Sequence, residues 1–156
     1  QILYCSAEAN SVYQADVVKA ALEAKGVNVT VYTFADSNDV ATVTQTACAE
    51  NDALYIPTDN TAASCTEAIN NVAEPAGVPI VAGEEGICKG CGIATLSIDY
   101  YELGKTTGAM AAKILTGEAN VSEMPIEYYQ NPVKKYDVAR CEALGITVPA
   151  DYVAIG

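Results

Sequence analysis

The sequence predicts an α/β fold, a three-layer sandwich with helices on both faces of a mainly parallel sheet of about five to six strands. Two observations lead to this prediction. Short apolar runs typical of buried strands alternate with longer segments of helical periodicity, which is the pattern of βαβ units with right-handed crossovers. In addition, the chain has 156 residues, of which 51% are hydrophobic, so a single domain with its own core is expected.

Caps and apolar patterns locate the first two strand–helix pairs. Residues 2–5 form an apolar run, and the helix that follows opens in a capping box at Ser11 and ends at Gly26. The alternation of valines with polar residues at 27–31 predicts the second strand. A Thr-rich segment at 38–50 predicts the second helix, whose low helix propensity makes it dependent on packing.

The middle of the chain continues this alternation. Strands are expected at 53–56 and 79–82, where short apolar runs recur. The helix between them starts near Asn60 and ends before Pro75 or Gly77, because these two residues are typical helix terminators.

A fifth strand and a long helix follow. The strand is expected at 94–98, and Asp99 then caps a helix that Gly117 ends. The residues expected to form the buried face of this helix are Leu103, Thr107, Met110, Ala111, Ile114 and Leu115. A sixth strand is expected at 126–129, and a short helix at 138–144.

The chain is strongly acidic, with a formal net charge of −12 and no His. Such a surface repels phosphate backbones and anionic lipid, so nucleic acid and membrane surfaces are not expected partners. No stretch of about 18 uninterrupted apolar residues is present, so no membrane span is predicted. Without His, the usual general base and the commonest metal ligand are missing. No P-loop or dinucleotide-binding glycine motif follows the first strand, and we expect no catalytic residue, metal or cofactor.

Cys88 and Cys91 form a Cys-x-x-Cys pair, for which redox, metal-binding and structural roles are the alternatives. A thioredoxin-like pair lies at the start of a helix, whereas here a Gly-flanked loop followed by a strand is expected. A zinc site would need a second pair, and the remaining cysteines show no such spacing. We therefore expect a structural loop pair, with its disulfide state open, and mostly reduced thiols elsewhere.

Polar loops follow several expected strands at their carboxyl ends, where ligands bind in this kind of fold. Their oxygen- or amide-bearing residues are Ser6, Glu8, Asn10, Ser11, Thr58, Asp59, Asn60, Glu84, Glu85 and Asp99. Capping alone would explain several of them individually. Together, however, clustered carboxylates favour an incoming cation, and free helix N–H groups favour a carboxylate. We therefore predict a site for a small zwitterionic ligand.

Five stretches resemble the substrate-binding proteins of ABC transporters, in the branch that includes tryptophan- and tyrosine-type amino-acid binders. They are "ILYCSAEANS", "DALYIPTDNTAAS", "VPIVAGEEG", "ATLSIDYYELGKTTGAMAAKILTGEA" and "ALGITVPADY". The resemblance implies a type I periplasmic-binding-protein fold with two α/β lobes, of which residues 1–156 form the second and 126–156 its tail near the hinge. It also implies that the GEEG turn offers Glu85, with Glu84 beside it, to the amino group of the ligand.

The same resemblance implies partners and a location. The partners are an amino-acid-like solute, the missing N-terminal lobe of the same receptor and an ABC permease. The location is extracytoplasmic, in a periplasm or as a lipoprotein on the cell surface. The start of the chain at Gln1, directly before an expected strand, leads us to expect one lobe of a longer protein.

The alternative on topology is a stand-alone flavodoxin- or receiver-like signalling domain or enzyme. Asp59 fits a receiver, but Asp99 stands where a receiver would carry Lys.

Overall fold

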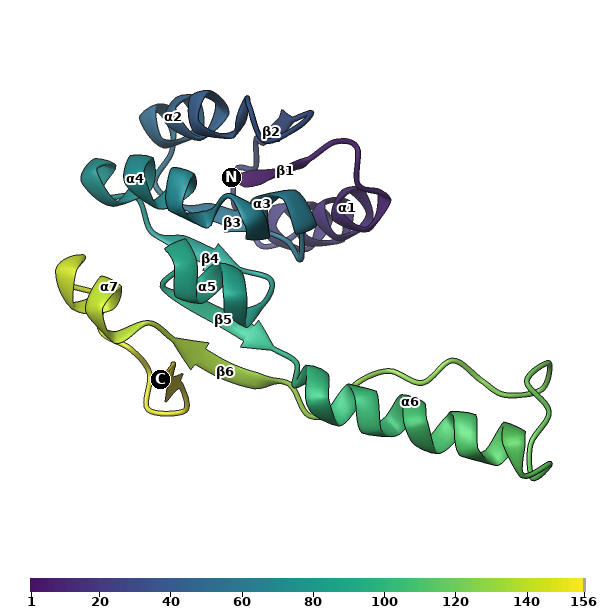
Figure 1. Ribbon diagram of the computed structural model, residues 1–156. Helices are drawn as coiled ribbons and strands as arrows, with labels where there is room; N and C mark the ends of the chain where they lie inside the picture. Colours follow the sequence, from purple (N-terminus) through teal and green to yellow (C-terminus); the bar gives the residue numbers. More distant parts are fainter. Residues whose placement is uncertain (156) are drawn as a thin grey trace.

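Residues 1–155 are described by the computed structural model, in which helices lie on both faces of a seven-stranded sheet (Figure 1). The strands are β1 (Ile2–Cys5), β2 (Val31–Phe34), β3 (Leu54–Ile56), β4 (Ile80–Ala82), β5 (Ala94–Ser97), β6 (Val133–Tyr136) and β7 (Val153–Ala154). The helices are α1 (Ala9–Glu23), α2 (Val40–Glu50), α3 (Asn60–Ser64), α4 (Thr66–Ala76), α5 (Glu85–Cys91), α6 (Tyr100–Leu115) and α7 (Val138–Ala143).

The strand order is β2-β1-β3-β4-β5-β6-β7. Strands β1 to β5 pair in parallel, β6 runs antiparallel to β5, and β7 is parallel to β6. The predicted α/β fold with a mainly parallel sheet is therefore confirmed. The additional strand is β7, which has only two residues.

The core lies mainly between the sheet and one layer of helices. Helices α2, α4 and α5 cover the face that carries Leu3, Leu54 and Ile80, each of which is at most 2% exposed. Helix α1 covers the opposite face over β1 and β3, where Ile2 packs with Ala15. Burial of each such aliphatic side chain contributes about 1.5–3 kcal/mol, so these two layers hold the sheet.

The second strand lies at Val31–Phe34 rather than at 27–31. Ile2–Cys5 pairs with that segment residue by residue, from Ile2 opposite Val31 to Cys5 opposite Phe34. Val29 still packs partly against α1, which explains why the alternation resembles a strand. The register is decided by the pairing with β1, and a local pattern does not contain that information.

The strand predicted at 126–129 is also wrong. Ile126 is 80% exposed, and the strand β6 forms at Val133–Tyr136 instead, with Tyr136 opposite Ala94 of β5. Two consecutive lysines, Lys134 and Lys135, break the apolar pattern there. A strand near the edge of a sheet tolerates such charges because its side chains reach solvent.

Residues 85–91 form helix α5, where the sequence indicates a Gly-flanked loop. Gly90 allows α5 to approach α4 closely, since a Cβ atom on it would lie 2.4 Å from the Thr66 Cβ. Cys88 and Cys91 are consequently buried on a helix and are free thiols. Burial raises the pKa of each thiol to about 12, which disfavours the reactive thiolate.

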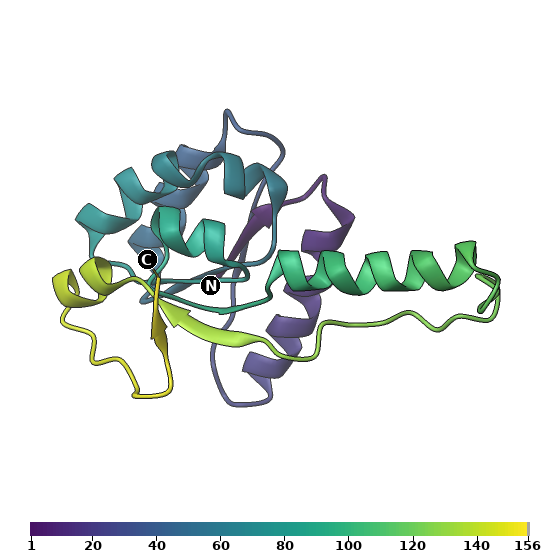
Figure 2. The same ribbon diagram turned by 60° about the horizontal axis from the view of Figure 1, so that its bottom comes forward.

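The predicted buried face of α6 is wrong for this chain. Within the described residues, none of the side chains of α6 is buried, and Leu115 is 87% exposed. Helix α6 and the segment 116–132 project from the sheet as an arm (Figures 1 and 2). Val81 and Leu96 are 41% and 56% exposed on the sheet, because α6 does not fold back over them. The apolar periodicity of α6 therefore has no packing partner among residues 1–155.

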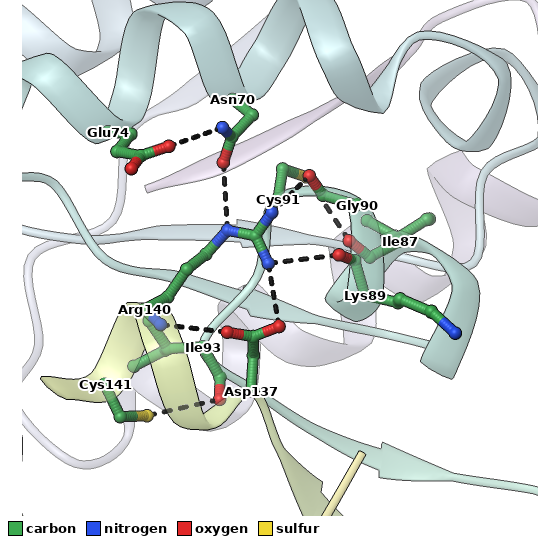
Figure 3. A network of polar contacts seen from close by, with 10 residues as sticks. All are labelled: Asn70, Glu74, Ile87, Lys89, Gly90, Cys91, Ile93, Asp137, Arg140 and Cys141. Atoms are coloured by element: carbon green, nitrogen blue, oxygen red, sulfur yellow. Dashed lines mark hydrogen bonds and ion pairs between the residues drawn. The ribbon is translucent and has the colours of Figure 1, made fainter. Parts of the chain in front are cut away.

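Arg140 of α7 anchors the C-terminal part of the chain to helices α4 and α5 (Figure 3). Its guanidinium donates to the Asn70 side chain of α4 and to the carbonyl oxygens of Lys89 and Gly90 at the end of α5, at 2.7–3.0 Å. It also pairs with Asp137 at 3.0 Å. Because a guanidinium presents five donors in a fixed plane, one side chain joins these elements at once.

Candidate ligand-binding site

The loops that follow β1, β3, β4 and β5 lie at one edge of the sheet, because these strands are parallel neighbours. Direct hydrogen bonds join them. Glu8 of the first loop accepts from Asn60 of the second, and the Thr58 hydroxyl donates to the Gly83 carbonyl at 3.3 Å. The loops that sequence analysis selected are therefore brought together. The ligand-binding role of their residues stays a prediction.

Glu8 is a brace between two of these loops. Its carboxylate accepts four hydrogen bonds, from the backbone and side chain of Asn60 and of Thr61, at 2.7–2.9 Å. Partial burial raises the pKa of Glu8, but these hydrogen bonds outweigh it, and the pKa falls to about 2. Glu8 is therefore charged at neutral pH and has its acceptor capacity filled by protein groups.

Asp59 is buried, with 1% of its surface exposed. Its carboxylate accepts from the backbone N–H of Cys5 at 2.8 Å and from that of Ala62 at 2.7 Å. It thereby caps α3 and joins the end of β1 to the loop after β3. The geometry places Asp59 beneath the edge of the sheet, in support of the loops.

Of the predicted site residues in this half of the edge, Ser6, Asn10 and Asn60 are exposed. The Asn10 side chain donates to the Thr58 carbonyl at 3.0 Å. Gln14, which sequence analysis did not include, donates to the same carbonyl and accepts from the Thr58 N–H at 3.1 and 3.0 Å. Its position one turn after Asn10 was the available signal.

Ser11 lies in the first turn of α1 and does not form the capping box predicted there, because Glu8 is the N-cap of this helix and no side chain in the described part of the chain caps it. Ser11 is fully buried, and its hydroxyl has no hydrogen-bond partner among the described residues. It therefore lies below the surface on which a ligand would bind.

A cavity of about 350 Å³ occupies the other half of the same edge. Residues from the ends of β4 and β5, the starts of α5 and α6, the segment 116–132 and the strand β6 line it: Glu84, Glu85, Gly86, Ser97, Ile98, Asp99, Tyr100, Tyr129, Val133 and Lys135. The volume is within the range of pockets for small molecules, about 300–1,000 Å³. The cavity therefore combines carboxylates, one ammonium group and two aromatic rings.

Two of the three carboxylates in the cavity cap helices. Glu84 accepts from the N–H groups of Gly86 and Ile87 at the start of α5. Asp99 accepts from those of Tyr101 and Glu102 at the start of α6, at 2.9 and 3.1 Å. The capping interpretation thus applies to both residues, although it does not prevent their outer edges from facing a ligand.

Glu85 has a different partner. Its Oε2 atom lies 2.5 Å from the Nζ atom of Lys135, and both side chains are partly exposed. Sequence analysis missed Lys135 because it placed the last strand at 126–129. Tyr100 also lines the cavity, where burial and the nearby Glu84 raise the pKa of its phenol. The clustered carboxylates are therefore compensated by backbone N–H groups and one lysine.

Metal binding finds no support in residues 1–155, where no three His, Cys, Asp or Glu side chains are grouped suitably for an ion. None of the helices in this range combines the length and the apolar character needed to cross a membrane.

Comparisons with solved structures identify similar folds. The ABC domain in complex with L-Trp from Streptococcus pneumonia superposes with a TM-score of 0.88, at 28% identity over 96% of this chain. A conserved domain protein from Vibrio cholerae gives a TM-score of 0.89 at 27% identity over 98% of the chain. A ligand-free, open substrate-binding protein with adhesive properties from Clostridium difficile gives 0.76 at 31% identity over 99%. The chain spans 50–54% of these three structures.

Sequence comparisons agree with the structural ones. A tyrosine-binding protein from Clostridioides difficile (strain R20291) is 30% identical over 125 residues, which cover 80% of this chain and 36% of that protein. The family model for ABC transporter substrate binding proteins matches residues 1–154. These named relatives bind substrates, and none of their names describes a catalyst. The chain therefore belongs to the family of ABC transporter substrate-binding proteins.

Proposed function

We propose that this chain is the second lobe of a non-catalytic receptor that binds an amino-acid-like solute between two lobes and delivers it to an ABC importer. The observation that carries the proposal is the cavity at the carboxyl edge, because it holds both signs of charge and two tyrosines on the side where the polar loops meet. A zwitterion with an aromatic or apolar side chain matches this chemistry.

The arm supports a second lobe. Tyr101, Leu115 and Ile126 are 75–87% exposed along it, and exposed apolar surface of this kind marks an interaction site. The relatives extend beyond this chain, which spans 50% of the Trp-bound structure. We propose that α6 and the segment 116–132 pack on the missing N-terminal lobe, and that residues 126–156 return the chain past the hinge.

In this arrangement the residues of the edge divide into two groups. Ser6, Asn10 and Asn60 face outward and would contact the ligand or the closing lobe. Glu8 and Asp59 would hold those loops in place through their hydrogen bonds. Lobe closure would then bury the ligand and present a surface to the permease, a hinge motion that fits an extracytoplasmic receptor.

The family assignment favours this function over a stand-alone flavodoxin- or receiver-like signalling domain or enzyme. Residues 1–154 match the substrate-binding family, whereas the alternative rests on sheet topology alone.

The test uses a receptor that carries both lobes. Amino acids and related amines are screened by thermal shift, and hits are measured by calorimetry. Asn10→Ala is expected to weaken binding about tenfold, the effect of one lost hydrogen bond to a charged ligand. Asn28→Ala, an exposed residue in the loop before β2, is the matched control and should leave affinity unchanged. A receptor whose melting temperature responds to none of these compounds would refute the proposal.

A further inference from the structure

Lys135 is a charged residue of the cavity at the carboxyl edge of the sheet. It projects from β6, opposite Thr95 of β5, and its ammonium group reaches the carboxylate of Glu85 at the start of α5. Its side chain is 28% exposed and that of Glu85 is 38% exposed, so both remain accessible from the cavity. Among the described residues that line this cavity, Lys135 is the one with a positive charge.

The other charged groups of the cavity are committed to backbone donors. Glu84 and Asp99 each cap a helix through two N–H groups. These contacts form part of the helix ends and would be lost only if the helices frayed. The pair of Glu85 and Lys135 joins two flexible side chains instead, and such partly exposed pairs contribute little to stability. A ligand can therefore replace this pair at low cost, provided that it supplies both opposite charges.

On the basis of the proposed function, we propose that Lys135 determines selectivity for zwitterionic amino acids. The ligand carboxylate binds the Lys135 ammonium, and the ligand ammonium binds the Glu85 carboxylate, so each protein charge exchanges one partner for another. Tyr100 and Tyr129, which line the same cavity, flank the side chain of the ligand. An amine without a carboxylate would take Glu85 away from Lys135 and leave the lysine unpaired as the cavity closes.

The neighbouring lysine provides a matched control. Lys134 precedes Lys135 on β6, and successive side chains of a strand point to opposite faces. It pairs with Asp151 at 2.6 Å, and its side chain is 49% exposed. Lys134→Met and Lys135→Met therefore make the same chemical change in the same strand, but only one of them alters the cavity.

The experiment measures, by calorimetry on the two-lobed receptor, the affinity ratios of tyrosine to tyramine and of tryptophan to tryptamine. In the wild-type receptor, both ratios should favour the amino acid. Lys135→Met should reduce them at least tenfold, mainly by weakening amino-acid binding, whereas Lys134→Met should leave them unchanged. Glu85→Gln should shift preference the other way, toward the deaminated acid 3-(4-hydroxyphenyl)propionate. Circular dichroism confirms that each variant is folded.

The outcomes separate the two proposals. If the wild-type receptor binds amino acids and Lys135→Met keeps the wild-type ratios, the role of Lys135 is wrong while the proposed function stands. If Lys134→Met changes the affinity ratios as much as Lys135→Met does, the loss of one positive charge explains the effect without a contact between Lys135 and the ligand. The inference is then also wrong. If the wild-type receptor binds no amino acid in the thermal-shift screen, the proposed function and the role of Lys135 both fail.

Discussion

Replacing Asp59 with Ala tests whether the burial of this helix-capping carboxylate determines how much it contributes to the free energy of unfolding. The carboxylate accepts the N–H groups of Cys5 and Ala62, which are 2% and 0% exposed, and Asp59 itself is 1% exposed. Removing it leaves two buried donors without an acceptor, and each costs about 1–3 kcal/mol. We therefore expect a loss of roughly 2–6 kcal/mol, with about 4 kcal/mol as a central value.

Asp99→Ala is the matched control, because Asp99 also accepts two backbone N–H groups but is exposed. Water can satisfy those donors after the substitution, so the expected loss is about 1 kcal/mol or less. Urea unfolding followed by circular dichroism measures both variants. At about 2–4 °C per kcal/mol for a chain of this size, Asp59→Ala should also melt roughly 8–16 °C below the wild type.

Equal destabilisation by the two substitutions would refute this reasoning, because it would show that burial does not decide the cost. A large loss for Asp59→Ala would also change how binding data are interpreted. Weak ligand binding by that variant would then reflect displaced loops and would not identify Asp59 as a ligand contact.

Three further predictions follow from close packing and from shifted pKa values. Gly83→Ala should destabilise the protein by more than about 1 kcal/mol, since the added Cβ would lie 2.6 Å from the backbone nitrogen of Thr58 in the loop after β3. Gly104→Ala, which has open space around it, should be neutral or stabilising. The midpoints of urea unfolding measure the stability of both variants. A thiol reagent should modify the half-buried Cys65 in the native protein. It should modify Cys91 only after unfolding, because burial raises the pKa of that thiol to about 12. Peptide mapping by mass spectrometry identifies the modified residues. The folded pKa of Glu8 is about 2, below the ordinary 4.5, so its contribution to stability is present above pH 4.5 and is lost as the pH falls toward 2. Glu8→Gln should therefore flatten the pH dependence of the unfolding free energy between pH 4.5 and 2. An unchanged slope would contradict the assigned hydrogen bonds.

Local patterns were sufficient for much of the fold. The cap Asp99 and the terminator Gly77 were recognisable because helix ends need particular side chains and backbone conformations at particular positions. The helix after β3 was expected to start near Asn60, and the residue before it, Asp59, is its N-cap. The edge on which the polar loops meet followed from the parallel order of the strands. In contrast, β2 and β6 were misplaced, because strand register depends on the partner strand.

The candidate site could be predicted only as a set of loops. Periodicity cannot distinguish a buried carboxylate such as Asp59 from an exposed one such as Asp99, since both look like caps. It also cannot pair Glu85 with Lys135, because 50 residues separate them in the chain. Nor can it tell which protein segment an apolar helix face will contact, as α6 demonstrates.

The sequence by itself determined the α/β class and the edge at which polar groups gather, because helix caps and strand–helix alternation are local properties. The family followed separately, from the resemblance of five stretches of the chain to known members and from the match to the family model. The tertiary structure alone decided which carboxylates are buried, which one has a lysine as its partner, and that α6 leaves the sheet. Those features depend on contacts between distant segments, whose energies arise only when the chain is folded.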